Sequence, residues 1–430
     1  MRNLRRVSAI VAVPLCVAYL SLLSPVAPAH GAGAAPPGPV GGPQLGSRGV
    51  VVDLSAGLRP PKLGASSYLI ADGDTGEVLA AKDPHGKYLP ASALKALTAV
   101  ALIPRLDPDA TVRPTRSTVN VEGSKVGMTP KLTYRVEDLF KAALMVSGND
   151  ASLGLAQANG GVERTLDAMN AEARRLQAND TLAGSPHGLD MDLGLSIKTQ
   201  HTSAYDLALI LRQGLKLPDF REYVGTVHAR WQTLPTKKQR KEGKKTASYP
   251  LYSHDRLLPG ESYAYRGMIG GKNGYTNAAR QTFVGAARRD GHTVIISLMH
   301  SRTLWPYATR LLDWGFKARG RVKPVGNLVD PLPTQNAKKE AERRPDGGGG
   351  VTLNPLAAED GSGGGWSRPL AGSAVVAAVG GIAVLMFRRR RARIATGVAG
   401  PRRRRTDTTG HDRTRNVTVI ERPTDPRQGD

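Results

Sequence analysis

Residues 280–300 read RQTFVGAARRDGHTVIISLMH and hold two largely apolar runs on either side of a short polar segment. The runs extend from Arg280 to Ala287 and from Thr293 to His300. The connection between them, Arg288-Arg289-Asp290-Gly291, contains an Asp-Gly pair, which favours the tight turn of a β-hairpin. We therefore predict two antiparallel strands in this part of the chain.

A second hairpin is predicted earlier, where Ser66 to Ala71 and Glu77 to Ala81 flank the turn-forming segment Asp72-Gly73-Asp74-Thr75-Gly76. Segments with helical spacing of apolar residues are Ser92 to Pro104, Val136 to Ala158, Leu166 to Leu176, Ser203 to Leu215 and Leu304 to Phe316. Strands near both ends with helices between them differ from βαβ alternation. They predict an α+β domain in which an antiparallel sheet is flanked by helices.

The composition excludes several function classes. The 430 residues include 60 Lys and Arg against 36 Asp and Glu, a formal charge of +24. Part of this excess lies in residues 388–430, and only 5% of residues are aromatic, so we expect no nucleic-acid partner. Cys16 is the single cysteine, which excludes a disulfide scaffold and a cysteine metal site. The histidines show no metal-ligand spacing, and no phosphate-binding glycine loop is present, so no metal and no cofactor is expected.

The N-terminal segment has the features of an export signal. Arg2, Arg5 and Arg6 precede an apolar run, and Ala27-Pro28-Ala29 supplies a small-residue cleavage pattern. We predict a signal peptide over residues 1–29, with an uncleaved membrane anchor as the alternative. A Gly, Ala and Pro-rich flexible leader is predicted over residues 30–61.

The C-terminal quarter of the chain has a second set of targeting features. Residues 326–368 are predicted to be a Gly and Pro-rich linker. The segment Pro369 to Phe387 contains no charged residue and is long enough for a transmembrane helix. It is followed by Arg388 to Arg391. By the positive-inside rule, residues 388–430 are predicted to lie in the cytoplasm and the preceding domain to face outward. We expect this tail to be disordered. The prediction is a single-pass protein of the cell membrane with one substantial domain over residues 62–325.

Ser92-Ala93-Leu94-Lys95 places a hydroxyl and an amine one helical turn apart. A neutral Lys95 can accept the Ser92 proton, which makes Ser92 a candidate nucleophile. Ser147-Gly148-Asn149 offers a second hydroxyl that can relay a proton and an amide that can hold a substrate.

A third motif, Gly271-Lys272-Asn273-Gly274-Tyr275-Thr276, leads into the strand that begins near Arg280. Lys272 would supply positive charge beside the nucleophile, and Gly274 allows close approach of a substrate backbone. The backbone N–H groups of Tyr275 and Ser92 are candidates for an oxyanion hole.

Together and in this order, the three motifs resemble the Ser-x-x-Lys, Ser-x-Asn and Lys-Thr-Gly triplet of the penicillin-recognising serine enzymes. The surrounding sequence is similar to the low-molecular-mass D-alanyl-D-alanine carboxypeptidases over roughly residues 62–320. The segments that carry this similarity are Leu89 to Ala99, Ser147 to Ala151, Gly188-Leu189-Asp190, Asp255 to Leu258 and Gly271 to Thr276.

The resemblance implies a β-lactamase/transpeptidase-like fold with a five-stranded antiparallel sheet. It implies removal of the terminal D-alanine from peptidoglycan stem peptides through a Ser92 acyl-enzyme that β-lactams trap. Lys95 would be the general base and Ser147 a proton relay. Asn149, Lys272, Asn273, Gly274, Tyr275 and Thr276 would bind the substrate.

Two departures from the family pattern leave alternatives open. Asn273 stands where the family has Thr, whose hydroxyl is expected to bind the terminal carboxylate of the substrate. A catalytically impaired wall-binding or regulatory homologue is therefore one alternative. A serine β-lactamase is another, with Glu163 as the candidate that activates water. We also expect that the β-rich second domain, which many relatives have before their membrane anchor, is not present in this chain.

A cationic run lies in a predicted loop between helix and strand. Its members are Lys237, Lys238, Arg240, Lys241, Lys244 and Lys245. Such a run is usually a solvated surface, and the alternative interpretation is an anchor on anionic wall polymers or lipid headgroups.

Overall fold

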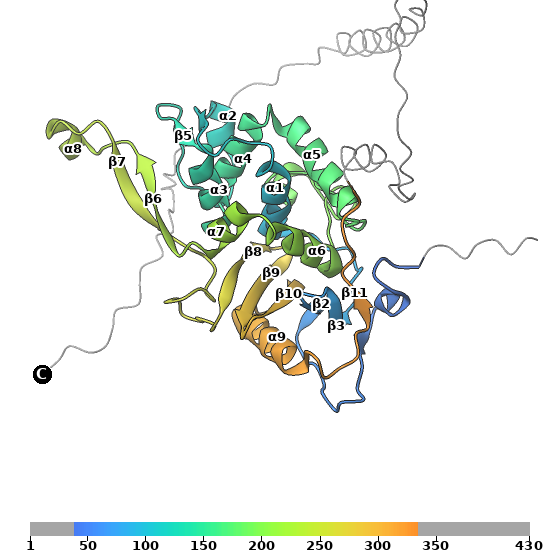
Figure 1. The fold of residues 1–430 in the computed structure, drawn as a ribbon. Coiled ribbons are helices and arrows are strands. Elements are labelled where there is room, and N and C mark those ends of the chain that lie inside the picture. The colour runs from blue at the N-terminus through green and yellow to red at the C-terminus, as the bar shows by residue number, and fades with distance from the viewer. Residues whose placement is uncertain (1–37, 334–430) are drawn as a thin grey trace, which may run out of the picture. The chain divides into compact units, whose positions relative to one another are not determined.

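The computed structural model describes residues 38–333, and Figure 1 shows the arrangement of their elements. The strands are β1 Val50–Val52, β2 Ala65–Asp72, β3 Glu77–Lys82, β4 Thr111–Val112, β5 Tyr134–Arg135, β6 His228–Thr233, β7 Ala247–Tyr252, β8 Met268–Thr276, β9 Arg280–Arg289, β10 His292–Ser301 and β11 Gly326–Asn327. The α-helices are α1 Lys95–Leu102, α2 Arg116–Val119, α3 Val136–Met145, α4 Asn149–Ala158, α5 Val162–Arg175, α6 Ala204–Gly214, α7 Pro218–Gly225, α8 Lys237–Lys241 and α9 Trp305–Ala318.

The main sheet is antiparallel and has the strand order β1-β3-β2-β10-β9-β8, with β11 also paired to β3. The predicted α+β class and both predicted hairpins are confirmed. In the later hairpin, Arg289 pairs with His292, so Asp290 and Gly291 form a two-residue loop with φ values of 51° and 81°. A type I′ turn, which Asp-Gly pairs favour, requires positive φ at both of these positions.

The expected number of five strands is wrong, because the sheet has seven. The two additional strands, β1 and β11, both pair with β3. β1 spans three residues and β11 spans two. Strands this short carry no alternating pattern that sequence reasoning could detect.

The sheet separates two hydrophobic cores, and alternate residues of one strand enter different cores. On β10, Ile295 and Met299 belong to the core shared with α1, α3 and α6, whereas Ile296 and Leu298 belong to the core covered by α9. This is the period of two expected for a strand that is buried on both faces. In Figure 1, α9 accordingly lies on the opposite side of the sheet from the other helices.

The N-terminal boundary differs from the expected one. The flexible leader was predicted over residues 30–61, but residues 38–61 belong to the folded domain. Leu45 is fully buried in the main core, and Val51 pairs with Ala81 through β1. Burial of one leucine and pairing of a three-residue edge strand order this segment despite its Gly and Pro content.

The C-terminal boundary also shifts. The linker was predicted to begin at residue 326, yet Asn327 donates its N–H to Gly41 at 2.8 Å, and Leu328 donates to Gly76 at 2.7 Å. Leu328 is buried. The first residues of the predicted linker therefore complete the sheet and fix the N-terminal segment.

The predicted signal peptide, transmembrane helix and tail, and most of the linker, lie outside the described residues. Within residues 38–333, no helix combines the length and apolar character needed to span a bilayer.

Candidate active site

Ser92 lies in a 3-10 turn, Ala91–Leu94, that runs directly into α1 at Lys95. The preceding Ala91 has a φ of 46°, a conformation that is costly for a residue with a side chain. Lys95 Nζ donates to Ser92 Oγ at 2.9 Å, as the three-residue spacing predicts.

Lys95 is the centre of the site. It is 1% exposed, and its Nζ also donates to Asn149 Oδ1 at 2.8 Å and to the His187 carbonyl at 2.7 Å. Ser147 Oγ lies 3.5 Å away. Burial lowers the pKa of Lys95 well below its ordinary value, and the nearby charge of Lys272 lowers it further. The structure therefore favours the neutral amine that a general base requires.

The second motif connects α3 to α4. Ser147 has a φ of 63° and is buried, so the chain turns sharply before Asn149 begins α4. Asn149 donates from Nδ2 to the Glu122 carbonyl at 2.7 Å, which turns its Oδ1 toward Lys95. Asp150 secures the same loop by accepting the N–H groups of Val126 and Met128, each at 3.0 Å.

Lys272 occupies the middle of β8 and is fully buried. Its Nζ donates to the Asn273 carbonyl at 2.7 Å and lies 3.3 Å from Asn273 Oδ1. Burial lowers the pKa of Lys272 to about 7, and the charge of Asp255 acts in the opposite direction. The Asn273 amide is thereby oriented with its oxygen toward Lys272, which leaves its N–H groups for another acceptor.

The Ser92 turn is held between two glycines from distant segments. A Cβ added at Gly274 on β8 would lie 2.6 Å from Ser92 N, and one at Gly188 would lie 1.9 Å from the Ala91 carbonyl oxygen. Both approaches require the absence of a side chain. The two flanking segments are joined directly, because Thr276 Oγ1 donates to Asp190 Oδ2 at 2.5 Å.

The structure thus brings Ser92, Lys95, Ser147 and Asn149 into contact through one amine and places β8 beside the Ser92 turn. Sequence reasoning assigned no role to His187, Gly188 or Asp190, although it noted the segment Gly188-Leu189-Asp190. Their contacts are with residues about 90 positions away in the chain, so no local spacing indicates them. Glu163, the candidate water-activating group of a β-lactamase, is exposed on the first turn of α5.

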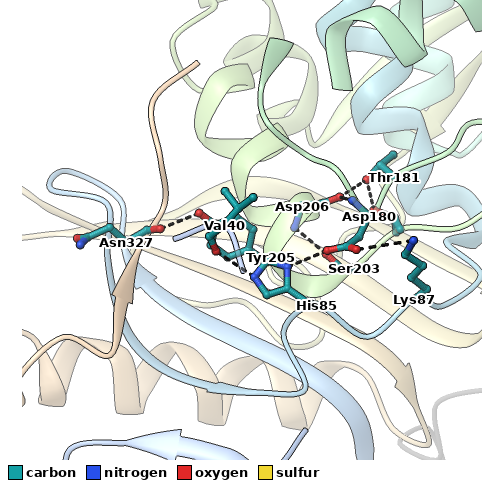
Figure 2. A network of polar contacts seen from close by, with 10 residues as sticks. Val40, His85, Lys87, Asp180, Thr181, Ser203, Tyr205, Asp206 and Asn327 are labelled. Carbon is teal, nitrogen blue, oxygen red and sulfur yellow. Dashed lines mark hydrogen bonds and ion pairs between the residues drawn. The ribbon is translucent and has the colours of Figure 1, made fainter. Parts of the chain in front are cut away.

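One group of side chains among residues 38–333 has the composition of a metal site: His85, Asp180 and Asp206. Figure 2 shows hydrogen bonds that join these side chains to one another and to neighbouring residues, including Val40 and Thr181. His85 Nδ1 lies 2.7 Å from Asp180 Oδ2, and its Nε2 lies 3.0 Å from the Val40 carbonyl. Because both partners accept, both ring nitrogens act as donors, and the pKa of His85 is raised by Asp180 despite burial. We interpret the group as an ion pair that holds the N-terminal segment.

Residues 55–303 match the pattern of peptidase family S11, D-alanyl-D-alanine carboxypeptidase. The chain belongs to this family. It is therefore a serine-type D-alanyl-D-alanine carboxypeptidase with a function in the cell wall, and the expected family resemblance is confirmed.

Individual relatives agree with this assignment. The carboxypeptidase DacB2 of Mycobacterium tuberculosis is 36% identical over 270 residues, covering 61% of this chain and 86% of that protein. DacF of Bacillus subtilis is 26% identical and covers 59% and 62%, respectively.

Solved structures support the same fold. The crystal structure of a D-alanyl-D-alanine carboxypeptidase from M. tuberculosis H37Rv matches this carboxypeptidase with a TM-score of 0.58 and 34% identity, covering 64% of this chain and 99% of that one. The Streptomyces K15 DD-transpeptidase shares the fold with a TM-score of 0.53 at 23% identity, covering 60% and 99%.

Proposed function

We propose that this carboxypeptidase removes the terminal D-alanine from peptidoglycan stem peptides through an acyl-enzyme on Ser92. The observation that carries the proposal is the contact of Lys95 Nζ with Ser92 Oγ, at 2.9 Å, in a buried setting that lowers the pKa of the amine. A neutral amine at hydrogen-bond distance from a hydroxyl is the arrangement required to activate that hydroxyl as a nucleophile.

In the acylation step, Ser92 Oγ attacks the carbonyl carbon of the scissile peptide bond while Lys95 takes its proton. The backbone N–H groups of Ser92 and Tyr275 are proposed to stabilise the oxyanion. The C–N bond then breaks, and the leaving D-alanine nitrogen receives a proton through Ser147. The products of this step are free D-alanine and an ester on Ser92.

In the deacylation step, a water molecule attacks the ester carbonyl and loses a proton to Lys95 as its oxygen adds. Collapse of the intermediate returns a proton to Ser92 Oγ and releases the shortened stem peptide. The buried charge of Lys272 stabilises negative charge in both steps, and Asn149 holds the substrate amide.

Recognition of the terminal carboxylate falls to Asn273 in this proposal. Its amide N–H groups can donate to a carboxylate because its oxygen faces Lys272. Thr276, in contrast, already donates its single hydroxyl proton to Asp190. The carboxyl group of a β-lactam would use the same donor, so covalent inhibition by β-lactams through Ser92 is part of the proposal.

We further propose that the catalytic domain acts outside the cytoplasm. The export signal over residues 1–29, the apolar segment over residues 369–387 and the arginines that follow it support this topology. The carboxypeptidase would then be held at the cell membrane by one C-terminal helix, with residues 388–430 inside the cell.

The test is D-alanine release by the purified full-length chain from a peptide ending in D-Ala-D-Ala, with Ser92→Ala as the matched control. Release that disappears in Ser92→Ala, together with covalent labelling of the unmodified chain by fluorescent penicillin, is the expected result. Absence of both release and labelling in a folded sample would favour the impaired wall-binding homologue, and Asn273→Thr would then be tested for recovery.

A further inference from the structure

The cationic run found in the sequence forms the tip of a projecting hairpin. β6 and β7 pair over six residues each, from His228 opposite Tyr252 to Thr233 opposite Ala247. The helix α8 lies between them, and Figure 1 shows the hairpin extending away from the rest of the domain. The predicted loop is therefore an ordered element rather than an irregular connection.

The tip has a defined conformation. Thr236 and Gln239 form a capping box in which the Thr236 side chain accepts the Gln239 N–H and the Gln239 side chain accepts the Thr236 N–H. On α8, Lys237 and Lys241 are one helical turn apart, which places their Cβ atoms roughly 5–6 Å from each other. The positive charges on α8 are therefore held in a fixed arrangement by a short capped helix.

The charged residues of the tip are cationic with one exception, Glu242. Residues 236–246 contain the six exposed side chains Lys237, Lys238, Arg240, Lys241, Lys244 and Lys245, with no apolar residue among them. Within the described part of the chain, the one acidic group within 4.0 Å of any of the six is Glu242, which lies 3.8 Å from Lys244. Most of this charge is available to a partner.

The middle of the hairpin is fixed to the body of the domain near the second motif. Trp231 is buried and stacks on Tyr134 with ring centroids 4.9 Å apart. Tyr249 donates its hydroxyl to the Val126 carbonyl at 2.6 Å. Val126 also donates to Asp150, the neighbour of Asn149. The hairpin therefore has a fixed connection to the loop whose Val126 is bonded to Asp150.

We propose that the tip, residues 236–246, binds the phosphodiester backbone of an anionic cell-wall polymer and keeps the enzyme on the wall that carries its substrate. Six closely spaced cations suit a chain of repeating negative charges better than one small anion. The absence of apolar side chains argues against insertion into a lipid surface. The proposal rests on the proposed extracytoplasmic location.

The test compares three full-length proteins: the unmodified chain, a tip variant and a charge-matched control. The tip variant replaces the six cations with Gln. The control replaces six scattered exposed cations with Gln: Arg105, Lys131, Arg164, Arg174, Arg310 and Arg321. Each is sedimented with wall sacculi that carry phosphodiester polymers, and with sacculi from which hydrofluoric acid has removed them.

We expect the unmodified chain and the control to bind intact sacculi and to be released by salt. The tip variant should bind about tenfold or more weakly, since neutralising several phosphate contacts weakens binding steeply. Removal of the polymers should have the same effect on the unmodified chain. D-alanine release from a soluble peptide should be equal in all three proteins, which separates this result from failure of the proposed function.

Three results would overturn the proposal. The first is equal binding of the unmodified chain to stripped and intact sacculi, and the second is an equal loss of binding in the tip variant and the control. The third concerns lipid: if the tip variant keeps full binding to sacculi but loses flotation with phosphatidylglycerol vesicles, the tip is a membrane contact instead.

Discussion

Thr276 on β8 and Asp190 in the loop after His187 are joined by a hydrogen bond of 2.5 Å between Oγ1 and Oδ2. Thr276 Oγ1 also accepts the N–H of Ala279 at 3.0 Å, so the hydroxyl acts as donor and as acceptor within the protein. The contact closes a ring around Ser92, because its two segments contribute Gly274 and Gly188 to either side of the Ser92 turn.

The Thr276–Asp190 contact should matter for rate more than for substrate affinity. Thr276→Val removes the donor beside the Tyr275 N–H and should lower kcat about tenfold, as expected for one hydrogen bond to a charged group, with little change in KM. Thr276→Ser keeps the hydroxyl and should retain most activity. Steady-state D-alanine release and the rate of acylation by fluorescent penicillin measure both. Equal losses in Val and Ser variants would contradict this explanation.

Asn273 should determine recognition of the terminal carboxylate. Asn273→Ala should raise KM about tenfold for a peptide ending in D-Ala-D-Ala, because one charge-assisted hydrogen bond is lost. Asn273→Thr should restore a donor and keep KM low. The control substrate ends in D-alaninamide and lacks the carboxylate. If the Ala variant loses the same factor on both substrates, Asn273 does not read the carboxylate.

The pH profile should show an alkaline limb set by Lys272. Its pKa is lowered to about 7, so Lys272 is charged below that pH and loses its charge as the pH rises through it. We therefore expect kcat/KM to decline above pH 7. On the acid side, activity should fall as Lys95 becomes protonated, at a pH below the ordinary lysine range.

Lys272→Arg tests the assignment of this limb. A guanidinium keeps its charge throughout this range, so the alkaline limb should move upward by at least one pH unit even if the maximum rate is lower. Circular dichroism across the range shows whether the variant is folded. A limb that stays in place would assign it to a different group.

Gly188 should tolerate no side chain. A Cβ there would meet the Ala91 carbonyl oxygen at 1.9 Å, and the φ of 85° is already unfavourable for alanine. Gly188→Ala should lower the free energy of unfolding by about 2–4 kcal/mol and slow acylation of Ser92. Gly194→Ala is the matched control, since its φ is 65° with no atom within 4 Å of the added Cβ. The control should cost about 1 kcal/mol, and comparable losses would refute the steric argument.

Several parts of the fold and site could be predicted because their signals are local. Ser92 and Lys95 are three residues apart on one helical face. The residue pair Asp290-Gly291 by itself favours the two-residue turn of a β-hairpin. The strands β2, β3, β9 and β10 are long enough to show a pattern, whereas the fifth long strand of the sheet, β8, is rich in glycine and was expected only from the family resemblance. Each of these local features is determined by residues close together in the sequence, so a single sequence is enough to predict it.

Other parts depend on contacts between distant segments. The carbonyl of His187 holds Lys95 without any requirement on its side chain, so the residue type gives no indication of the contact. β1 is identified by its pairing with β3 rather than by its three valines. The Gly and Pro-rich context of residues 38–61 suggested flexibility, whereas burial of Leu45 and the hydrogen bond to Asn327 fix the segment.

The place where the chain leaves the sheet has a mechanical consequence. β11 pairs with β3, whereas β8, with Lys272 and Gly274, forms the opposite edge of the same sheet. A force applied to the chain beyond residue 333 would first load the bond from Leu332 N to the Arg175 carbonyl, and then the contacts of Asp330 with Gln177 and Arg212. The bonds from Leu328 to Gly76 and from Asn327 to Gly41 would follow. These bonds would yield by peeling one after another, while three strands separate β3 from β8. The first bonds to be loaded therefore lie in the C-terminal segment, apart from the β8 residues that contact the Ser92 turn.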